Sequence, residues 1–169
     1  MLRRSYEPDQ LLREHPPRLH HPHKRLLFEL ACPPGAVHSG LIAMAAPSGG
    51  QGRYRRDELG MILRTAWIGF AAAVAESRRS WPGARTEIRT GFWGCGALRG
   101  NRCAMTLLQL LAARMAGVER VRFHAVDAAG LLDAEAGVAA FARVSAHAAD
   151  LGAAALIGRV EAEGFEWIQ

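Results

Sequence analysis

The sequence predicts an α/β fold in which helices flank a parallel or mixed sheet. Short β-prone runs alternate with long runs of helical periodicity, half of the residues are hydrophobic, and no internal repeat occurs. Alternation of strands and helices is typical of parallel sheets. With 169 residues the chain is long enough to bury a core. We therefore expect one α/β domain over residues 41–169, preceded by a basic arm over residues 1–40.

The arm is rich in proline and histidine. Six prolines fall within it, and four histidines lie between positions 15 and 23. Histidine clusters can bind metal, but no cysteine or carboxylate is interleaved among His20, His21 and His23. A solvated arm is therefore favoured over a metal site. Leu26 to Cys32 is expected to form a short strand or a helical turn.

The net charge indicates which partners the protein favours, and the cysteines indicate the cellular compartment. The net charge of +5 favours anionic partners. The three cysteines, Cys32, Cys95 and Cys103, cannot all pair and form no CxxC motif, which favours free thiols in the cytoplasm or nucleus. No run of 18 apolar residues and no signal-peptide core occurs, so we expect no membrane segment.

The first half of the domain is predicted to hold a strand and a long helix. The apolar run Leu41–Ala46 favours a buried strand, and the loop Pro47–Gly52 ends it. Helical periodicity then runs to about Ser77, with Asp57 as the N-cap. Trp67 and Phe70 are expected in the core. Trp81-Pro82-Gly83 would end this helix.

The second half is predicted to hold two strands and further helices. Thr86–Thr90 is the first strand, and Cys103–Ala116 is a helix with Gly117 as its C-cap. A second strand begins near Val121 and ends at Asp127, where open α/β sheets place groups that contact ligands. From Leu131 to about Val160 we expect helix in two pieces, divided near residues 150–152. The tail that contains Trp167 is expected to pack back on the domain.

A glycine-rich loop lies between the first of these strands and the following helix. Gly91, Gly94, Gly96 and Gly100 occur within it, and Phe92 and Trp93 offer flat surface for a sugar or base. A strand, a glycine loop and a helix N-terminus together present N–H groups to an anion. The loop matches neither the P-loop nor the GxGxxG fingerprint, and a tight turn without a ligand is the alternative.

The amino-acid sequence of this loop is similar to a motif of a known protein family. Thr90–Asn101 resembles the TGNWGCGAFGGD segment of the poly(ADP-ribose) glycohydrolases. Leu107–Ala113 resembles the LIQ-x-x-AA helix of that family, and the strand that ends at Asp127 resembles its next strand. Upstream, Ile42–Ala46 with Tyr54 and then Ala66–Phe70 resembles the AIDA…Y…KAY-x-GF stretch. The resemblance covers about Leu41 to Asp127.

This resemblance implies a macrodomain-like core of three layers that is incomplete on its N-terminal side, where the chain is similar to the C-terminal half of the catalytic domain. It implies ADP-ribose or poly(ADP-ribose) as the ligand, with no cofactor, no metal and no need for nucleic acid. In the family the loop wraps the diphosphate and the nearby ribose. The residues that match this pattern are Gly91, Trp93, Gly94, Cys95, Gly96, Ala97 and Gly100.

Four residues depart from the family pattern. Phe92 replaces an asparagine, Leu98 replaces a phenylalanine, Arg99 replaces a glycine, and Ala125 replaces an aromatic residue near the strand end. Leu98 and Ala125 lack an aromatic surface on which a base could stack, and each lost contact would weaken the binding free energy by about 1–3 kcal/mol. Arg99 could instead add a charge-assisted contact to a phosphate.

The family's catalytic element, GGG…QEE, is not present in this sequence, and Gly49–Gly52 does not replace it. Cleavage of a glycosidic bond needs a positioned carboxylic acid, so we expect no catalytic residue in this sequence. The catalytic half is either missing, truncated or supplied by a partner segment. The alternatives are a non-catalytic ADP-ribose or nucleotide-binding module and a structural remnant. A cysteine hydrolase built on Cys95 with His124 or His147 is disfavoured, because Trp93 and Ala97 occupy the glycine positions of a nucleophile elbow.

Overall fold

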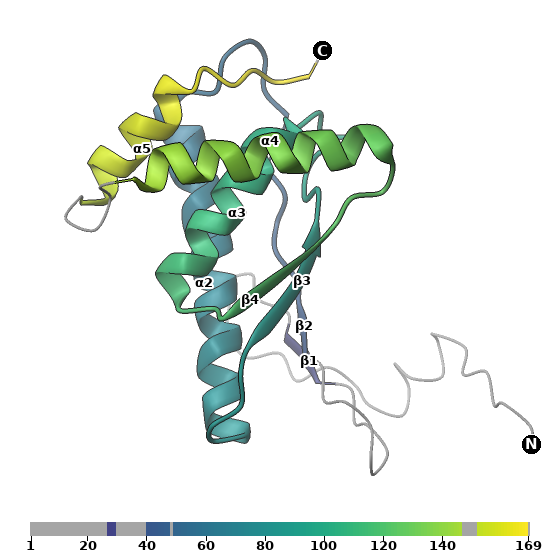
Figure 1. Cartoon of the computed structure of the whole chain (residues 1–169), viewed down its shortest axis with the longest axis vertical. Helices are drawn as coiled ribbons and strands as arrows, with labels where there is room; N and C mark the ends of the chain where they lie inside the picture. Colours follow the sequence, from purple (N-terminus) through teal and green to yellow (C-terminus); the bar gives the residue numbers. More distant parts are fainter. Residues whose placement is uncertain (1–26, 30–39, 48, 147–151, 169) are drawn as a thin grey trace, which may run out of the picture. The chain divides into compact units, whose positions relative to one another are not determined.

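The computed structural model in Figure 1 describes residues 27–29, 40–47, 49–146 and 152–168. The chain divides into two compact units, Met1–Met44 and Ala45–Gln169. In the first unit, β1 (Leu27–Glu29) pairs antiparallel with β2 (Gly40–Ile42). β1 confirms the short strand expected there. The histidine cluster of the arm lies outside the described residues.

The prediction of a buried strand over Leu41–Ala46 is wrong. β2 ends at Ile42, and Leu41 is 54% exposed. Within the described residues β2 has one neighbouring strand, β1, and each of the two strands is only three residues long. The run is therefore too short and too sparsely paired to form a covered strand of a sheet.

The described residues of the second unit form one two-stranded parallel sheet and four helices. Its elements are, in order, α2 (Arg56–Ser80), β3 (Glu87–Gly91), α3 (Arg102–Ala116), β4 (Arg120–His124), α4 (Ala128–Ser145) and α5 (Ala153–Ala162). β3 pairs parallel with β4, so that Gly91 lies opposite His124. The prediction of a macrodomain-like α/β fold, with a parallel or mixed sheet flanked by helices, is thus confirmed, and the sheet that the structure describes is small and parallel. The division of the last helical region is also confirmed, because α4 ends at Ser145 and α5 begins at Ala153.

The core is formed around α3, which packs against both α2 and α4 (Figure 1). Leu107 and Leu108 of α3 are fully buried, and so is Phe70 of α2, as predicted. Burial of each apolar side chain of this size contributes about 1.5–3 kcal/mol to the free energy of folding. Gly137 of α4 allows the close approach to α3, because a Cβ there would overlap the side chain of Thr106.

α2 is long and apolar enough to cross a membrane if length and composition alone are considered. Leu59, Ile62 and Phe70, however, lie on one face of α2 and are each 1% exposed. A core helix of this kind satisfies the same criteria, so this feature is weak evidence for a membrane segment.

The boundaries of α2 and one of its core residues differ from prediction. The N-cap is Arg55 and not Asp57, because Glu58 accepts a hydrogen bond from the Arg55 N–H at 2.7 Å. The Asp57 carboxylate instead pairs with the Arg55 guanidinium at 3.1 Å. Trp67 is 39% exposed, not buried, because it lies outside the stripe that faces α3.

Candidate functional site

The loop from Gly91 to Gly100 folds into successive tight turns. The N–H of Trp93 donates to Gly91 O at 2.8 Å, and the N–H of Cys95 donates to Phe92 O at 3.1 Å. Farther along, the N–H groups of Arg99 and Gly100 donate to Gly96 O and Gly94 O, each at 2.9 Å. The loop is therefore held by its own backbone.

Four other N–H groups of the loop are not used in this way. Those of Gly94, Gly96, Ala97 and Leu98 donate to no atom of the part of the chain that the structure describes. The last three residues are also exposed. Unpaired N–H groups that gather in a loop before a helix N-terminus can bind an anion. The loop thus has the donors that a phosphate group needs.

The glycines of the loop serve different purposes. Gly94 has φ +77°, which favours glycine. A Cβ on Gly100 would lie 2.7 Å from Gly94 O, so the turn excludes a side chain there. A Cβ on Gly96 would meet nothing within 4 Å. Gly94 and Gly100 are therefore required by the fold, whereas Gly96 leaves open space beside the free N–H groups.

Arg99 has the left-handed backbone that its position in the loop demands. Its φ is +56°, and it is the one residue other than glycine with a positive φ in the described ranges. This conformation costs a residue that carries a Cβ about 1–2 kcal/mol. Arg99 is also exposed, so its guanidinium is carried at the surface of the loop.

α3 anchors the beginning of the loop through a buried amide. Gln109 is fully buried, and its Nε2 donates to Gly91 O at 3.0 Å. The hydroxyl of Thr90 donates to Gln109 Oε1 at 2.5 Å. Because both polar ends of the amide are satisfied, Gln109 fixes the end of β3 against the helix.

Two aromatic residues far away in sequence anchor the end of the loop. The N–H of Asn101 donates to the Tyr54 hydroxyl at 2.8 Å, and the Tyr54 ring stacks on Trp167 with centroids 4.2 Å apart. Burial raises the pKa of Tyr54 to about 12, against the opposing effect of the hydrogen bond from Asn101, so the phenol is neutral. The N–H of Ile168 donates to Arg99 O at 3.0 Å. The tail therefore packs back on the domain as predicted.

Phe92 does not offer the free surface that the sequence predicts for it. Its ring meets Phe123 edge to face at 5.1 Å, and the Arg102 guanidinium lies 5.0 Å above it. A Cβ on Gly130 would overlap the same ring. Phe92 thus packs between the sheet and α4. Trp93 is half-buried, and its buried indole N–H has no partner among the described residues.

Cys95 lacks the environment of a nucleophile. Its thiol contacts Trp93 O at 3.7 Å, and no histidine of the described ranges forms a hydrogen bond with it. Burial raises the pKa of the Cys95 thiol to about 12. A catalytic cysteine requires the opposite shift. His147, the other histidine considered as a base, lies outside the described residues.

Two acids that come before and after the loop in the sequence, Glu87 and Asp127, have structural partners. Asp127 accepts a hydrogen bond from the Gly130 N–H at 2.6 Å as the N-cap of α4, and it lies 3.4 Å from the Arg102 guanidinium. Glu87 of β3 accepts from Arg89, and this bond holds the pKa of Glu87 below its usual range. Neither carboxyl is poised as a proton donor. Among the described residues, no group of three or more potential ligands could hold a metal.

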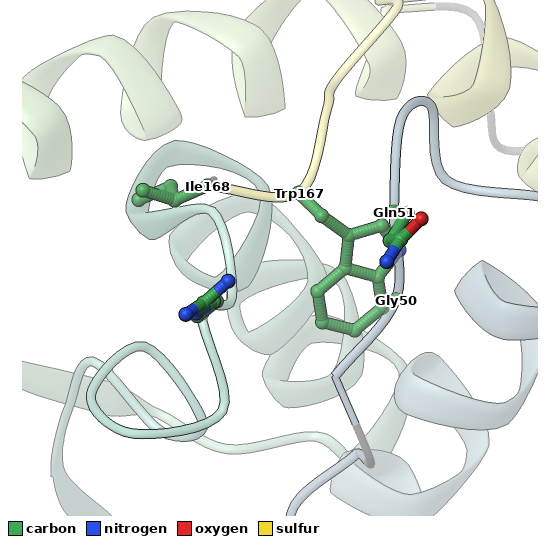
Figure 2. A pocket seen from close by; sticks show the side chains of 5 residues that line it. Gly50, Gln51, Trp167 and Ile168 are labelled. Carbon is green, nitrogen blue, oxygen red and sulfur yellow. The ribbon is translucent and has the colours of Figure 1, made fainter.

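A shallow pocket lies beside the end of the loop. It has a volume of about 260 Å³ and is lined by Gly50, Gln51, Arg99, Trp167 and Ile168. Figure 2 shows the Trp167 indole beside Gly50 and Gln51, with Ile168 at the other side. Gly50 lies so close to the indole that a Cβ would overlap it. Ligand pockets are usually about 300–1,000 Å³, so this one could hold only part of a nucleotide. Apart from Arg99, sequence reasoning did not find its residues, because they come from three separate segments.

The chain was compared with protein families and with known proteins. A family model described as poly(ADP-ribose) glycohydrolase (PARG), macro domain fold, matches residues 38–132. This range contains the whole glycine loop and extends slightly beyond the stretch in which the sequence resemblance was found. No curated protein and no solved structure matches the chain.

Proposed function

The chain belongs to the poly(ADP-ribose) glycohydrolase family, and from this premise we propose that its glycine loop binds the diphosphate of ADP-ribose. The observation that carries the proposal is the set of unpaired N–H groups at Gly94, Gly96, Ala97 and Leu98. Diphosphate oxygens need several converging donors, and small residues let the ligand approach them. A protein of this family has poly(ADP-ribose) as its expected substrate.

In this proposal, Gly96 and Ala97 lie closest to the phosphates, because they are exposed and their N–H groups are free. Gly91, Gly94 and Gly100 hold the turns around them. Trp93 and Cys95 are half-buried and support the loop from its inner side. Arg99 would add its guanidinium to the negatively charged ligand at the pocket beside the loop.

We further propose that the residues of this chain bind ADP-ribose without cleaving the polymer. Cleavage needs a carboxylic acid that protonates the leaving oxygen. The sequence contains no GGG…QEE element, and Asp127 is engaged with Arg102 and the start of α4. The acid would therefore have to come from residues outside this sequence, whether in a further segment of the chain or in a partner.

The test is a thermal-shift titration with ADP-ribose, with adenosine as the control ligand. A ligand that binds only the native state stabilises it by about 2.7 kcal/mol at a concentration of 100 Kd. ADP-ribose should raise the melting temperature, and adenosine should not. Absence of a response to both ligands would leave the structural-remnant alternative.

A pair of variants connects the response to the loop. Gly96→Val places a side chain in the open space beside the free N–H groups, and we expect it to remove the response to ADP-ribose while the protein stays folded. Gly60→Val is the matched control, because a Cβ there also meets nothing within 4 Å and Gly60 lies in α2. If the Gly96→Val protein still binds ADP-ribose, the ligand does not bind at the free N–H groups of the loop.

A further inference from the structure

One face of the β3–β4 sheet carries a cluster of arginines, which we call the arginine face. It is formed by Arg89 of β3 and by Arg120 and Arg122 of β4, with Glu87 among them. In the parallel register Glu87 lies opposite Arg120, and Arg89 lies opposite Arg122. Because side chains alternate along a strand, these residues share one face, and Ile88, Val121 and Phe123 occupy the other.

The positive charges of the arginine face are only partly balanced. All three guanidinium groups converge on the Glu87 carboxylate, at 3.0 Å for Arg89, 3.2 Å for Arg122 and 3.6 Å for Arg120. One carboxylate balances one of these cations, so two positive charges remain. The side chains of Arg89 and Arg120 are each 67% exposed and that of Arg122 is 52% exposed, so the excess charge faces solvent.

This composition is unusual for a parallel sheet. Parallel sheets are normally covered on both faces by helices and carry apolar residues on both sides. The arginine face has no apolar side chain to bury against a covering helix. In addition, like charges directly opposite one another, such as Arg89 and Arg122, destabilise strand pairing. An anionic ligand would relieve this repulsion.

The arginine face adjoins the proposed binding loop along the chain. β3 ends at Gly91, where the loop begins, and Arg89 precedes Gly91 by two residues, or about 7 Å along the strand. A linear polyanion whose terminal unit occupies the loop could therefore extend along the strand past these guanidinium groups. Poly(ADP-ribose) has the matching chemistry, because each unit carries a diphosphate.

We propose that the arginine face binds the diphosphates of poly(ADP-ribose) beyond the unit held in the loop. The identity of this ligand rests on the proposed function, whereas the excess of positive charge does not. The contacts are electrostatic, so they release counterions and their strength decreases steeply with salt.

The experiment measures the affinity of the protein for fluorescently labelled poly(ADP-ribose) between 50 and 300 mM salt. For single strands the slope of log K against log salt is about −0.7 for each neutralised phosphate. The double variant Arg120→Gln/Arg122→Gln should therefore reduce the steepness of the slope by about 1.4. The charge-matched control is Arg64→Gln/Arg114→Gln, whose two arginines are exposed on α2 and α3. It should leave the slope nearly unchanged.

A third variant distinguishes binding from folding. Glu87→Gln frees one more positive charge on the arginine face, so binding to the polymer should become tighter and the slope steeper by about 0.7. Partial unfolding would instead weaken binding. If Glu87→Gln weakens binding, or if both double variants behave alike, the arginine face is not a polymer site.

Two further measurements separate this inference from the proposed function. Single ADP-ribose units should stabilise the Arg120→Gln/Arg122→Gln protein as well as the wild type, because these arginines lie outside the loop. If the wild type does not respond to ADP-ribose but polymer binding still depends on the arginine face, the proposed function fails, and the arginine face stands as a polymer site without a terminal unit in the loop. Equal affinity for an RNA of matched charge, lost in the same variant, would overturn the assignment to poly(ADP-ribose).

Discussion

The hydroxyl of Tyr54 accepts a hydrogen bond from the backbone N–H of Asn101 at 2.8 Å. Asn101 is also the N-cap of α3, where its side chain accepts from the Ala104 N–H at 3.0 Å. The contact therefore joins the segment before α2 to the point at which the glycine loop ends and α3 begins.

Tyr54→Phe should lower the free energy of unfolding by about 1–3 kcal/mol, because it leaves the Asn101 N–H without its partner. The ring, and with it the stacking on Trp167, is retained. Urea unfolding measures the effect. Thr65→Val is the control, since among the described residues the Thr65 hydroxyl bonds only to Met61 O in the same helix. A surface change of this kind shifts stability by less than about 0.5 kcal/mol. Equal effects of both changes would show that the Tyr54 contact is dispensable.

Gly100→Ala should destabilise the protein by about 1–3 kcal/mol through overpacking, because its Cβ would lie 2.7 Å from Gly94 O. Gly96→Ala is the matched control and should change stability by less than about 0.5 kcal/mol, since nothing lies within 4 Å of its Cβ. Thermal melts of both variants check this difference. If Gly100→Ala were tolerated as well as Gly96→Ala, the turn around Gly94 would have a different shape from the one described.

Asp127→Ala should destabilise the protein more than Asp133→Ala, by about 1 kcal/mol. Both carboxylates lie close to Arg102, at 3.4 and 3.5 Å, but only Asp127 also caps α4. The pair therefore isolates the contribution of the cap from that of the ion pair. Urea unfolding of the two variants provides the measurement, and an equal loss would mean that the cap contributes nothing.

The thiol of Cys95 should react slowly with iodoacetamide in the native protein up to about pH 10. An unperturbed cysteine has a pKa of about 8.5, whereas burial raises that of Cys95 to about 12. The unfolded state therefore releases this proton first, so the contribution of Cys95 to stability is present below pH 8.5 and decreases as the pH rises toward 12.

Mass spectrometry of the alkylated peptide, with the urea-unfolded protein as the control, follows this reaction. Cys95→Ser should retain the fold. Rapid labelling of native Cys95 at pH 7.5 would contradict the burial of the thiol and would restore the cysteine-hydrolase alternative.

The purified protein should release no ADP-ribose from automodified poly(ADP-ribose). General acid and base assistance contributes about 10²–10⁴-fold to such reactions, and phosphate binding does not replace a proton donor at the leaving oxygen. Chromatography of the released product measures turnover. Substantial turnover that Asp127→Asn abolishes would show that Asp127 is the acid, despite its contacts with Arg102 and Gly130.

Local signals predicted much of the second unit. Gly117 ends α3 with φ +70°, as its position after the apolar periodicity indicates, and the glycine spacing placed the loop between β3 and α3. The amino-acid sequence of the loop also indicated the protein family, and the match to the family model confirms it. Properties of this kind depend on residues that are neighbours in the sequence.

Burial and contacts between distant segments were harder to predict. Leu41 and Trp67 are apolar but exposed, because Leu41 lies on a strand of only three residues and Trp67 lies outside the buried stripe of α2. Phe92 was expected to face a ligand, but it packs on Phe123 and Arg102 because α4 approaches closely at Gly130. The contacts of Tyr54 with Asn101 and Trp167 join three segments that are far apart in the sequence. Such contacts cannot be predicted from a local sequence pattern.

The packing of the tail against the loop also constrains the order in which the molecule is assembled. Ile168 donates to Arg99 O, and the Asn101 side chain donates to Glu166 O at 3.1 Å. These contacts span more than 60 residues of chain, so they can form only once residues 166–168 are present. During synthesis the glycine loop would emerge from the ribosome well before Glu166, Trp167 and Ile168 exist. The local turns of the loop need none of these residues, but its end at Arg99 and Asn101 is anchored only after they have been added.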